Sequence, residues 1–350
     1  YVFKFANEIL NSVKLSLISV LLIESIYFYN FTTPEFNVNV CQLPFWSLVV
    51  YYTWKIYDAK DIKFLDCFLV GFFAAVGFLS KYLFIYLLIS ISILFFYLIF
   101  FKKIKKFDFK LFLIIEVFLI MLVPHFIWLY DNDFITFVYG FKRTGLEEYN
   151  ILNHIYFPFT FILKQIGILI PFLFLSWILI KRLKFKINMK DKRVLYLLSI
   201  NVLPFLLILI TSIVTGSKIR TMWMTPFYLF LGVLVVYIFN AQINLKKINS
   251  FLCGFLILFF LSPALYIYIS ISQNDKRTDY PGKEIAAKAQ IVWDKDFNKE
   301  IEFVTGDEWK AGNLSYHLES RPKWEGYTNN KILNKSSQFI CIDDICLGRY

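Results

Sequence analysis

The feature that most constrains this chain is a series of long apolar runs separated by short charged segments. The run 251–271 contains no charged residue. A helix needs about 20 mostly apolar residues to cross the hydrocarbon core of a membrane. The sequence therefore predicts a mainly α, polytopic membrane helix bundle. About nine spanning helices are expected, over 12–30, 38–57, 65–80, 82–101, 111–129, 155–180, 194–215, 222–240 and 251–271.

Composition agrees with a membrane protein, since 58% of the 350 residues are hydrophobic, against about 45–50% in soluble domains. The net charge of +11 could indicate a nucleic-acid partner. The basic residues, however, lie mainly in short clusters between apolar runs, which is typical of the cytoplasmic loops of membrane proteins. Their distribution argues against nucleic-acid binding.

The basic clusters also predict the orientation. They fall on one side of the membrane, in the segments 55–63, 102–110, 181–193 and 246–247. Because cytoplasmic loops carry the excess of Lys and Arg, this side is assigned to the cytoplasm. The outer side then holds 31–37, the turn at Lys81, the loop 130–154, the loop 216–221 and everything from 272 onward. We expect a multi-pass protein of the bacterial inner (plasma) membrane.

The chain is expected to divide into a transmembrane bundle, 1–271, and a small periplasmic α/β domain, 272–350, where the composition becomes mixed and charged. In the second part, alternation and turn residues predict four elements. These are a helix from Pro281 to Trp293, a strand from Ile301 to Thr305, a helix from Ala311 to Leu318 and a strand from Gln338 to Ile342.

Two of the five cysteines are candidates for a disulfide. Cys341 and Cys346 bracket Ile-Asp-Asp-Ile in the segment assigned to the outer side. An oxidising compartment permits a disulfide there, but spacing alone does not decide its geometry. Cys41, Cys67 and Cys253 lie in or beside apolar spans and are expected to be core residues.

Charged residues at a membrane edge are costly, so each is a functional candidate. Lys81 either reaches for lipid headgroups or holds a phosphate, and its position leaves both readings open. Glu35 follows Pro34 where a helix is expected to begin, so the helix dipole alone explains it. Lys218 and Arg220 lie on the outer side against the charge bias, and an anionic lipid phosphate would account for both.

The outer loop 130–154 holds Asp131, Asp133, Lys142 and Arg143. Its length exceeds what a connection needs, which favours a function such as binding a charged lipid head or a sugar over a simple solvated loop. Glu24 and Glu116 lie inside apolar spans. Each is either a hydrogen-bond partner between helices or a catalytic group.

No cofactor is predicted. Motifs for zinc proteases, redox CxxC sites, Walker loops and dinucleotide sites are absent from the sequence. Participation of a divalent metal stays open. Carboxylates and cations gathered on the outer face of a helical bundle suit a lipid-linked phosphate donor.

Five segments resemble the polyprenyl-phosphate-sugar-dependent glycosyltransferases of the GT-C superfamily, which include the protein mannosyltransferases and the aminoarabinose transferases (glycosyltransferase families 39 and 83). These segments are TTPEFNVNVCQLPFWSL (32–48), GFFAAVGFLSKY (71–82), PHFIWLYDNDFITFVYGFKRTG (124–145), GSKIRTMWMTPFY (216–228) and RTDYPGKEIA (277–286).

The resemblance implies an integral-membrane enzyme that moves a sugar from a polyprenyl-phosphate carrier to a lipid, glycan or protein acceptor at the outer face. It implies that Lys81 contacts the carrier phosphate and that Glu35 lies beside the donor. Lys218 and Arg220 would be further phosphate or acceptor contacts. The general base of the family is an Asp in the first outer loop. The first helix of this chain resembles the third helix of the family. We therefore expect two further helices, and the general-base Asp between them, to precede this chain. We expect no transferase activity from the chain alone.

Two other classes of function compete. A transporter or flippase of lipid carriers would need a repeated pair of broken helices, which the sequence does not show. A structural or assembly protein would explain the topology but not the cations of the SKY, KRTG and KIRTMW segments.

Overall fold

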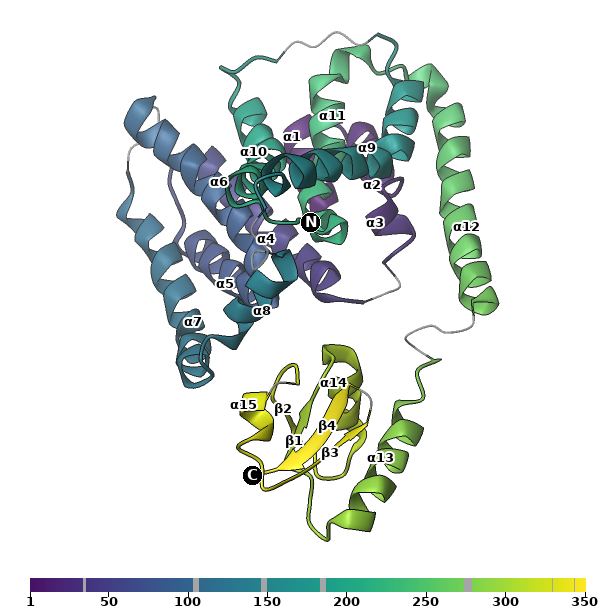
Figure 1. Cartoon of the computed structure of the whole chain (residues 1–350). Helices are drawn as coiled ribbons and strands as arrows, with labels where there is room; N and C mark the ends of the chain where they lie inside the picture. The colour runs from purple at the N-terminus through teal and green to yellow at the C-terminus, as the bar shows by residue number, and fades with distance from the viewer. Residues whose placement is uncertain are drawn as a thin grey trace. The chain divides into compact units, whose positions relative to one another are not determined.

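The computed structural model describes residues 1–33, 36–102, 107–145, 150–182, 187–273, 279–328, 330–342 and 344–350. Two compact units are formed, Tyr1–Ile267 and Tyr268–Tyr350. Each unit has a hydrophobic core of its own. Figure 1 labels the elements of both units.

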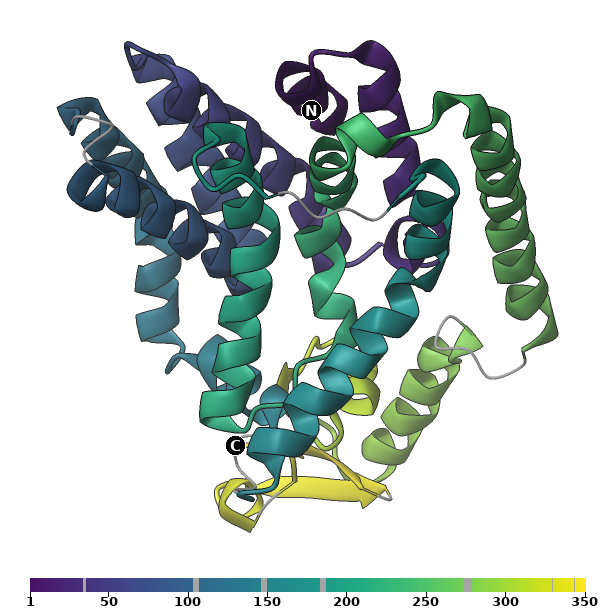
Figure 2. The ribbon, with the colours of Figure 1, turned by 90° about the horizontal axis from the view of Figure 1, so that it is seen from above.

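The first unit is helical. Its α-helices are α1 (Val2–Leu10), α2 (Val13–Ile23), α3 (Tyr27–Asn30), α4 (Val38–Asp58), α5 (Phe64–Ser80), α6 (Ile85–Phe96), α7 (Phe112–Asp131), α8 (Ile135–Thr144), α9 (Asn153–Leu179), α10 (Lys192–Thr215), α11 (Leu231–Ile238) and α12 (Ile248–Ser272). Short 3-10 helices include η1 (Tyr82–Phe84), η3 (Phe109–Leu111) and η4 (Thr221–Tyr228), and the π-helix η2 (Tyr97–Phe101) extends α6. Helix α5 packs between α4 and α7 (Figure 1). Helix α12 lies at one edge of the bundle (Figure 2), and within it only Phe251 is buried.

Among the described residues, five helical segments are long and apolar enough to cross a membrane. They are Tyr82–Phe101, Phe109–Asp131, Asn153–Leu179, Lys192–Thr215 and Leu245–Ser272. A sixth span is obtained if η4 and α11, which are bent by 54° at their junction, are counted together. The protein is thus a multi-pass membrane protein by its helices, while nine spans are not shown.

The three remaining expected spans differ from a long apolar helix for separate reasons. Helix α2 has 11 residues and ends before Glu24, and α5 has 17 residues. Helix α4 has 21 residues, but polar residues such as Asn39, Gln42 and Asp58 lower its hydropathy.

An aromatic core holds the beginning of α4 against η1 and η4. Trp46 of α4 is fully buried, with its ring centroid 5.4 Å from that of Phe84 and 5.0 Å from that of Phe227. Large buried aromatic side chains contribute much of the packing energy of a core. Three segments distant in the sequence are therefore fixed side by side around Trp46.

The second unit is a small α/β domain. Its helices are α13 (Gly282–Asp296), α14 (Glu308–His317) and α15 (Asn330–Leu333), and its strands are β1 (Phe303–Thr305), β2 (Lys323–Trp324), β3 (Gln338–Ile342) and β4 (Ile345–Arg349). The sheet order is β2-β1-β4-β3, with β1 and β2 parallel and the other pairs antiparallel. Trp293 of α13 is fully buried in its core. The four elements predicted from the sequence are confirmed, with ends shifted by no more than a turn.

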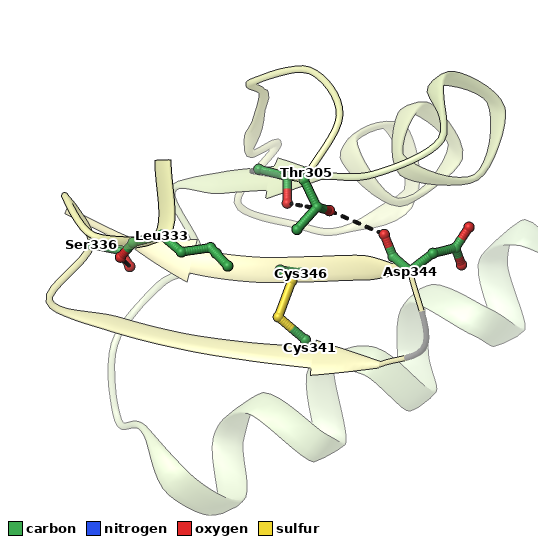
Figure 3. Close-up of a disulfide and its surroundings, with 7 residues drawn as sticks. Thr305, Leu333, Ser336, Cys341, Asp344 and Cys346 are labelled. Atoms are coloured by element: carbon green, nitrogen blue, oxygen red, sulfur yellow. Dashed lines mark hydrogen bonds between the residues drawn. A yellow bond between two sulfur atoms is a disulfide. The ribbon is translucent and has the colours of Figure 1, made fainter. Parts of the chain in front are cut away.

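The hairpin β3–β4 carries a disulfide (Figure 3). Cys341 and Cys346 are directly paired across the two strands and are joined through their sulfur atoms. Beside it, the hydroxyls of Thr305 and Thr328 lie 3.0 Å apart, and Thr328 donates to the carbonyl oxygen of Asp344 at 3.1 Å. These bonds tie the hairpin turn to β1.

Candidate anion-binding site

Lys81 lies between the end of α5 and the start of η1, outside the membrane-spanning helices. Its side chain is half-buried. The Nζ atom donates a hydrogen bond to Oδ1 of Asn39 at 2.5 Å and stands 4.8 Å from the ring centroid of Trp223. The ammonium group is thus held between an amide oxygen and the face of an indole ring, which attracts cations.

Asn39 is oriented by the start of its own helix. Asn37 is the N-cap of α4, and its Oδ1 accepts hydrogen bonds from the backbone N and the Nδ2 of Asn39, each at 2.9 Å. With Nδ2 engaged in this way, Oδ1 of Asn39 is left for Lys81. Asn39 is 3% exposed, so the amide is a fixed part of the fold.

The charges around Lys81 are positive. Burial, together with the guanidinium groups of Arg220 and Arg143, lowers the pKa of Lys81 to about 7. No carboxylate forms an ion pair with Lys81 among the described residues. An anion bound next to Lys81 would restore the ordinary pKa of this lysine, because an opposite charge within a few ångströms favours the charged form.

Three separate segments bring the cations together. Lys81 follows α5, Arg143 lies in the last turn of α8, and Arg220 immediately precedes η4. The backbone N of Lys218 donates to the carbonyl oxygen of Thr144 at 2.9 Å, which ties the segment 216–221 to the end of α8. The side chain of Lys218 is exposed.

Helix α8 is also attached to the start of η1. The hydroxyl of Tyr82 lies 2.7 Å from Nε2 of His125 and 2.8 Å from Oγ1 of Thr136. The ring of Tyr82 stacks on that of Phe137, with centroids 5.3 Å apart. His125 therefore serves the packing of α7, α8 and η1. Over the described ranges, no group of three His, Cys, Asp or Glu residues could hold a metal ion.

Other residues predicted for the site lie apart from this cluster or outside the described residues. Asp131 and Asp133 are exposed at the turn between α7 and α8, and neither forms an ion pair with a described residue. Glu35 lies outside the described residues, as does the side chain of Lys142. Glu116 is exposed on α7, and Glu24 caps the C-terminus of α2.

Sequence reasoning missed two residues of the cluster. Asn39 is one of several amides near the start of α4, and its contact with Lys81 spans 42 positions. Trp223 resembles an ordinary interfacial aromatic residue in the sequence. The available signal was that both lie inside segments quoted for the family resemblance, 32–48 and 216–228.

Comparison with known families bears on the same region. Residues 1–128 match the family model described as dolichyl-phosphate-mannose-protein mannosyltransferase. The match covers the first 128 of 350 residues, so this part, the mannosyltransferase-family segment, is similar to that family. Lys81 and Asn39 lie inside the mannosyltransferase-family segment, whereas Arg143, Arg220 and Trp223 lie beyond it. Searches of curated proteins and of solved structures found no match. The apolar helices describe a multi-pass membrane protein, and the match marks its first 128 residues as similar to a mannosyltransferase family.

Proposed function

We propose that this protein transfers a sugar from a polyprenyl-phosphate carrier to a lipid, glycan or protein acceptor at the periplasmic face of a bacterial inner membrane. The observation that carries the proposal is the placement of Lys81. It lies in the mannosyltransferase-family segment, is held by Asn39 and Trp223, and has Arg143 and Arg220 acting on it electrostatically.

The chemistry of transfer requires positive charge at one place. An acceptor hydroxyl or amine attacks the anomeric carbon of the sugar, and the bond from that carbon to the phosphate oxygen breaks. The electron pair leaves with the phosphate, which gains a negative charge. Fixed cations aimed at developing charge are among the largest contributions to catalysis. Lys81 is suited to this role because its ammonium group is a compact point charge.

The cost of assembling these cations is offset when the carrier binds. At an effective dielectric constant of 20, two opposite unit charges 4 Å apart attract by about 4 kcal/mol. A phosphate placed among Lys81, Arg143 and Arg220 would interact with all three. Water would compete poorly with this phosphate for Lys81, because the side chain of Lys81 is half-buried.

We assign the remaining candidates to supporting roles. The acceptor proton would pass to a carboxylate base, as in inverting transfer. Glu35 would lie beside the donor sugar, Lys218 would add a further phosphate or acceptor contact, and Asp131, Asp133 and Lys142 would contact the acceptor or the sugar from the turn and end of α8. No metal is assigned to the reaction.

The test is transfer of a radiolabelled sugar from a synthetic polyprenyl-phosphate donor in membranes that contain the protein at its full natural length. Lys81→Ala is expected to lower the rate by about 100-fold or more, the range found when one stabilising donor is removed from an oxyanion site. Lys164→Ala is the matched control, because Lys164 is an exposed lysine on α9. Unchanged transfer by Lys81→Ala would refute the phosphate role.

The same membranes separate transfer from transport. A flippase would move the intact lipid-linked sugar across vesicles without modifying any acceptor. The described residues contain one bent helix pair, η4 and α11, whereas inverted-repeat transporters have two at corresponding positions. We therefore expect label in an acceptor and none in a translocated carrier.

A further inference from the structure

Two adjoining cavities lie in the bundle; the polar one lies at the end away from Lys81, whereas the lining of the apolar one extends to Ile85. Helix α5 runs from Phe64 to Ser80, so the loop before Phe64 and Lys81 occupy its opposite ends. The same loop follows Asp58, the last residue of α4, whose first turn holds Asn39. Any site at the loop 59–63 is therefore separated from the carrier site by the length of these two helices.

The first cavity is apolar and has a volume of about 710 Å³. Residues of α4 and α5 form its floor, and Val49, Val70 and Ala74 among them are buried. Its rim includes Phe96 and Phe100, which are 55% and 56% exposed. Because α6 and η2 form a membrane-length helix, this rim faces hydrocarbon. The cavity is thus a groove open to acyl chains.

The second cavity is polar and has a volume of about 670 Å³. Its charged lining consists of Lys60, Lys190, Lys192, Asp58 and Asp108. Lys192 forms an ion pair with Asp58. Lys60 and Lys190 are exposed, and neither forms an ion pair with a described residue. Beyond that ion pair, the lining holds two cations, Lys60 and Lys190, and one carboxylate, Asp108, whose Oδ1 accepts a hydrogen bond from the backbone N of Lys110.

The two cavities meet at Phe107, which lines both. The two cavities are also adjacent at α4, because Ile56 lines the apolar cavity and the next residue, Tyr57, lines the polar one. A hydrocarbon groove that ends beside lysines at a membrane edge has the outline of a lipid with an anionic head. Basic pockets between helices on the cytoplasmic side commonly bind such heads.

We propose that these cavities bind one anionic glycerophospholipid of the leaflet on the basic side of the membrane. Its acyl chains occupy the groove between α5, α6 and α7, and its phosphate lies between Lys60 and Lys190. Lysines on the cytoplasmic side are common in membrane proteins. Lys60 and Lys190 differ from other such lysines because they line a polar cavity, and an apolar groove continues from that cavity.

The experiment is native mass spectrometry of the purified protein titrated with phosphatidylglycerol or with phosphatidylcholine of the same chains. Phosphatidylglycerol is expected to bind about tenfold or more tightly, because each lysine near an anionic lipid contributes substantially. Lys60→Gln combined with Lys190→Gln should abolish that preference. Lys246→Gln combined with Lys247→Gln is matched in charge, lies outside the cavity lining and should leave the preference unchanged.

Two further arms distinguish a lipid from a free phosphate and from the carrier. Ser92→Phe puts bulk into the apolar groove and should weaken phosphatidylglycerol binding, whereas Ser262→Phe on α12 should not. Glycerol phosphate should fail to compete, and Lys81→Gln should have no effect. The proposal fails if both lipids bind equally, if both lysine pairs behave alike, if glycerol phosphate competes fully, or if Lys81→Gln removes the binding.

Discussion

At the residue scale, the site rests on one lysine withdrawn partly from water. Lys81 donates to Asn39, lies over Trp223 and has a pKa of about 7 because of burial and two neighbouring guanidinium groups. Near neutral pH this lysine is therefore divided between its neutral and charged forms. A negatively charged ligand favours the charged form, so ligand binding and protonation are linked.

This linkage predicts a pH dependence of carrier binding. Above pH 7 the free protein has lost the proton of Lys81, and the complex must take it up again, so affinity falls as pH rises. For a glycosyl phosphodiester lipid, whose own charge does not titrate in this range, the dissociation constant should rise about tenfold per unit between pH 7.5 and 9. Fluorescence titration with a labelled lipid measures it.

Lys81→Arg is the control for that titration, because an arginine keeps its charge throughout this range. The affinity of Lys81→Arg for the lipid need not equal that of the wild type, but it should not change with pH over this range. A wild-type affinity that does not change across the same range would show that Lys81 does not face the phosphate.

Asn39 gives a second prediction for the same lysine. Asn39→Asp would place a carboxylate at the 2.5 Å contact with Nζ, which keeps Lys81 charged and occupies it internally. We expect phosphodiester binding to weaken by about tenfold, as for a lost charge-assisted hydrogen bond, and its pH dependence above pH 7 to disappear. Asn30→Asp, in α3, is the matched substitution, because the amide of Asn30 donates to the carbonyl oxygen of Leu258. Retained pH dependence in Asn39→Asp would contradict the assigned contact.

Sequence alone identified the cations but not their partners. Lys81, Lys218 and Arg220 stand out because they are cations on the side assigned to the outside, and this departure from the positive-inside rule can be read from the sequence alone. The role of Asn39 depends on the packing of α4 against α5, and the grouping of Arg143 with Arg220 depends on the path of α8. Such relations arise only when distant segments fold together.

At the element scale, a turn places the residues after α10. Gly216 ends α10 with φ of 67°, in the left-handed region, and an added Cβ would lie 3.0 Å from Nε2 of His154. Any other residue would be strained there. The segment that carries Arg220 and Trp223 therefore begins from a position that suits glycine.

Gly216→Ala is expected to weaken phosphodiester binding by about threefold or more, although Gly216 need not touch the ligand. A left-handed conformation costs a residue with a Cβ about 1–2 kcal/mol, and moving the segment 217–223 would relieve part of that strain. Gly167→Ala in α9 is the control, since no atom lies within 4 Å of the added Cβ. The titration used for Lys81 measures both variants. Equal effects would mean that the turn does not position the site.

Helix breaks explain why the sequence predicted more spans than the long helices show. Hydropathy over 12–30 does not reveal that α2 ends at Ile23 and that the chain continues into the short α3. Hydropathy over 222–240 does not reveal the bend between η4 and α11. The elements of the second unit were easier to predict, because their turns and alternating residues lie close together in the sequence.

At the scale of the whole molecule, the proposed function depends on the side of the membrane that each end of the bundle faces. The positive-inside rule assigns Lys60 to the cytoplasm and Lys218 to the outer face. In a background with Cys41, Cys67 and Cys253 replaced, Lys218→Cys should react with an impermeant maleimide in intact cells. Lys60→Cys should react only after the membrane is opened. The reverse pattern would contradict the orientation.

The account as a whole is tested most directly by the binding of a glycosyl phosphodiester polyprenol to the purified protein in nanodiscs. Saturable binding is expected, with an affinity lowered about tenfold or more in Lys81→Gln, as for a lost charge-assisted contact, and unchanged in Lys164→Gln on α9. Equal affinities for the wild type and Lys81→Gln would contradict the claim that the carrier phosphate binds at Lys81.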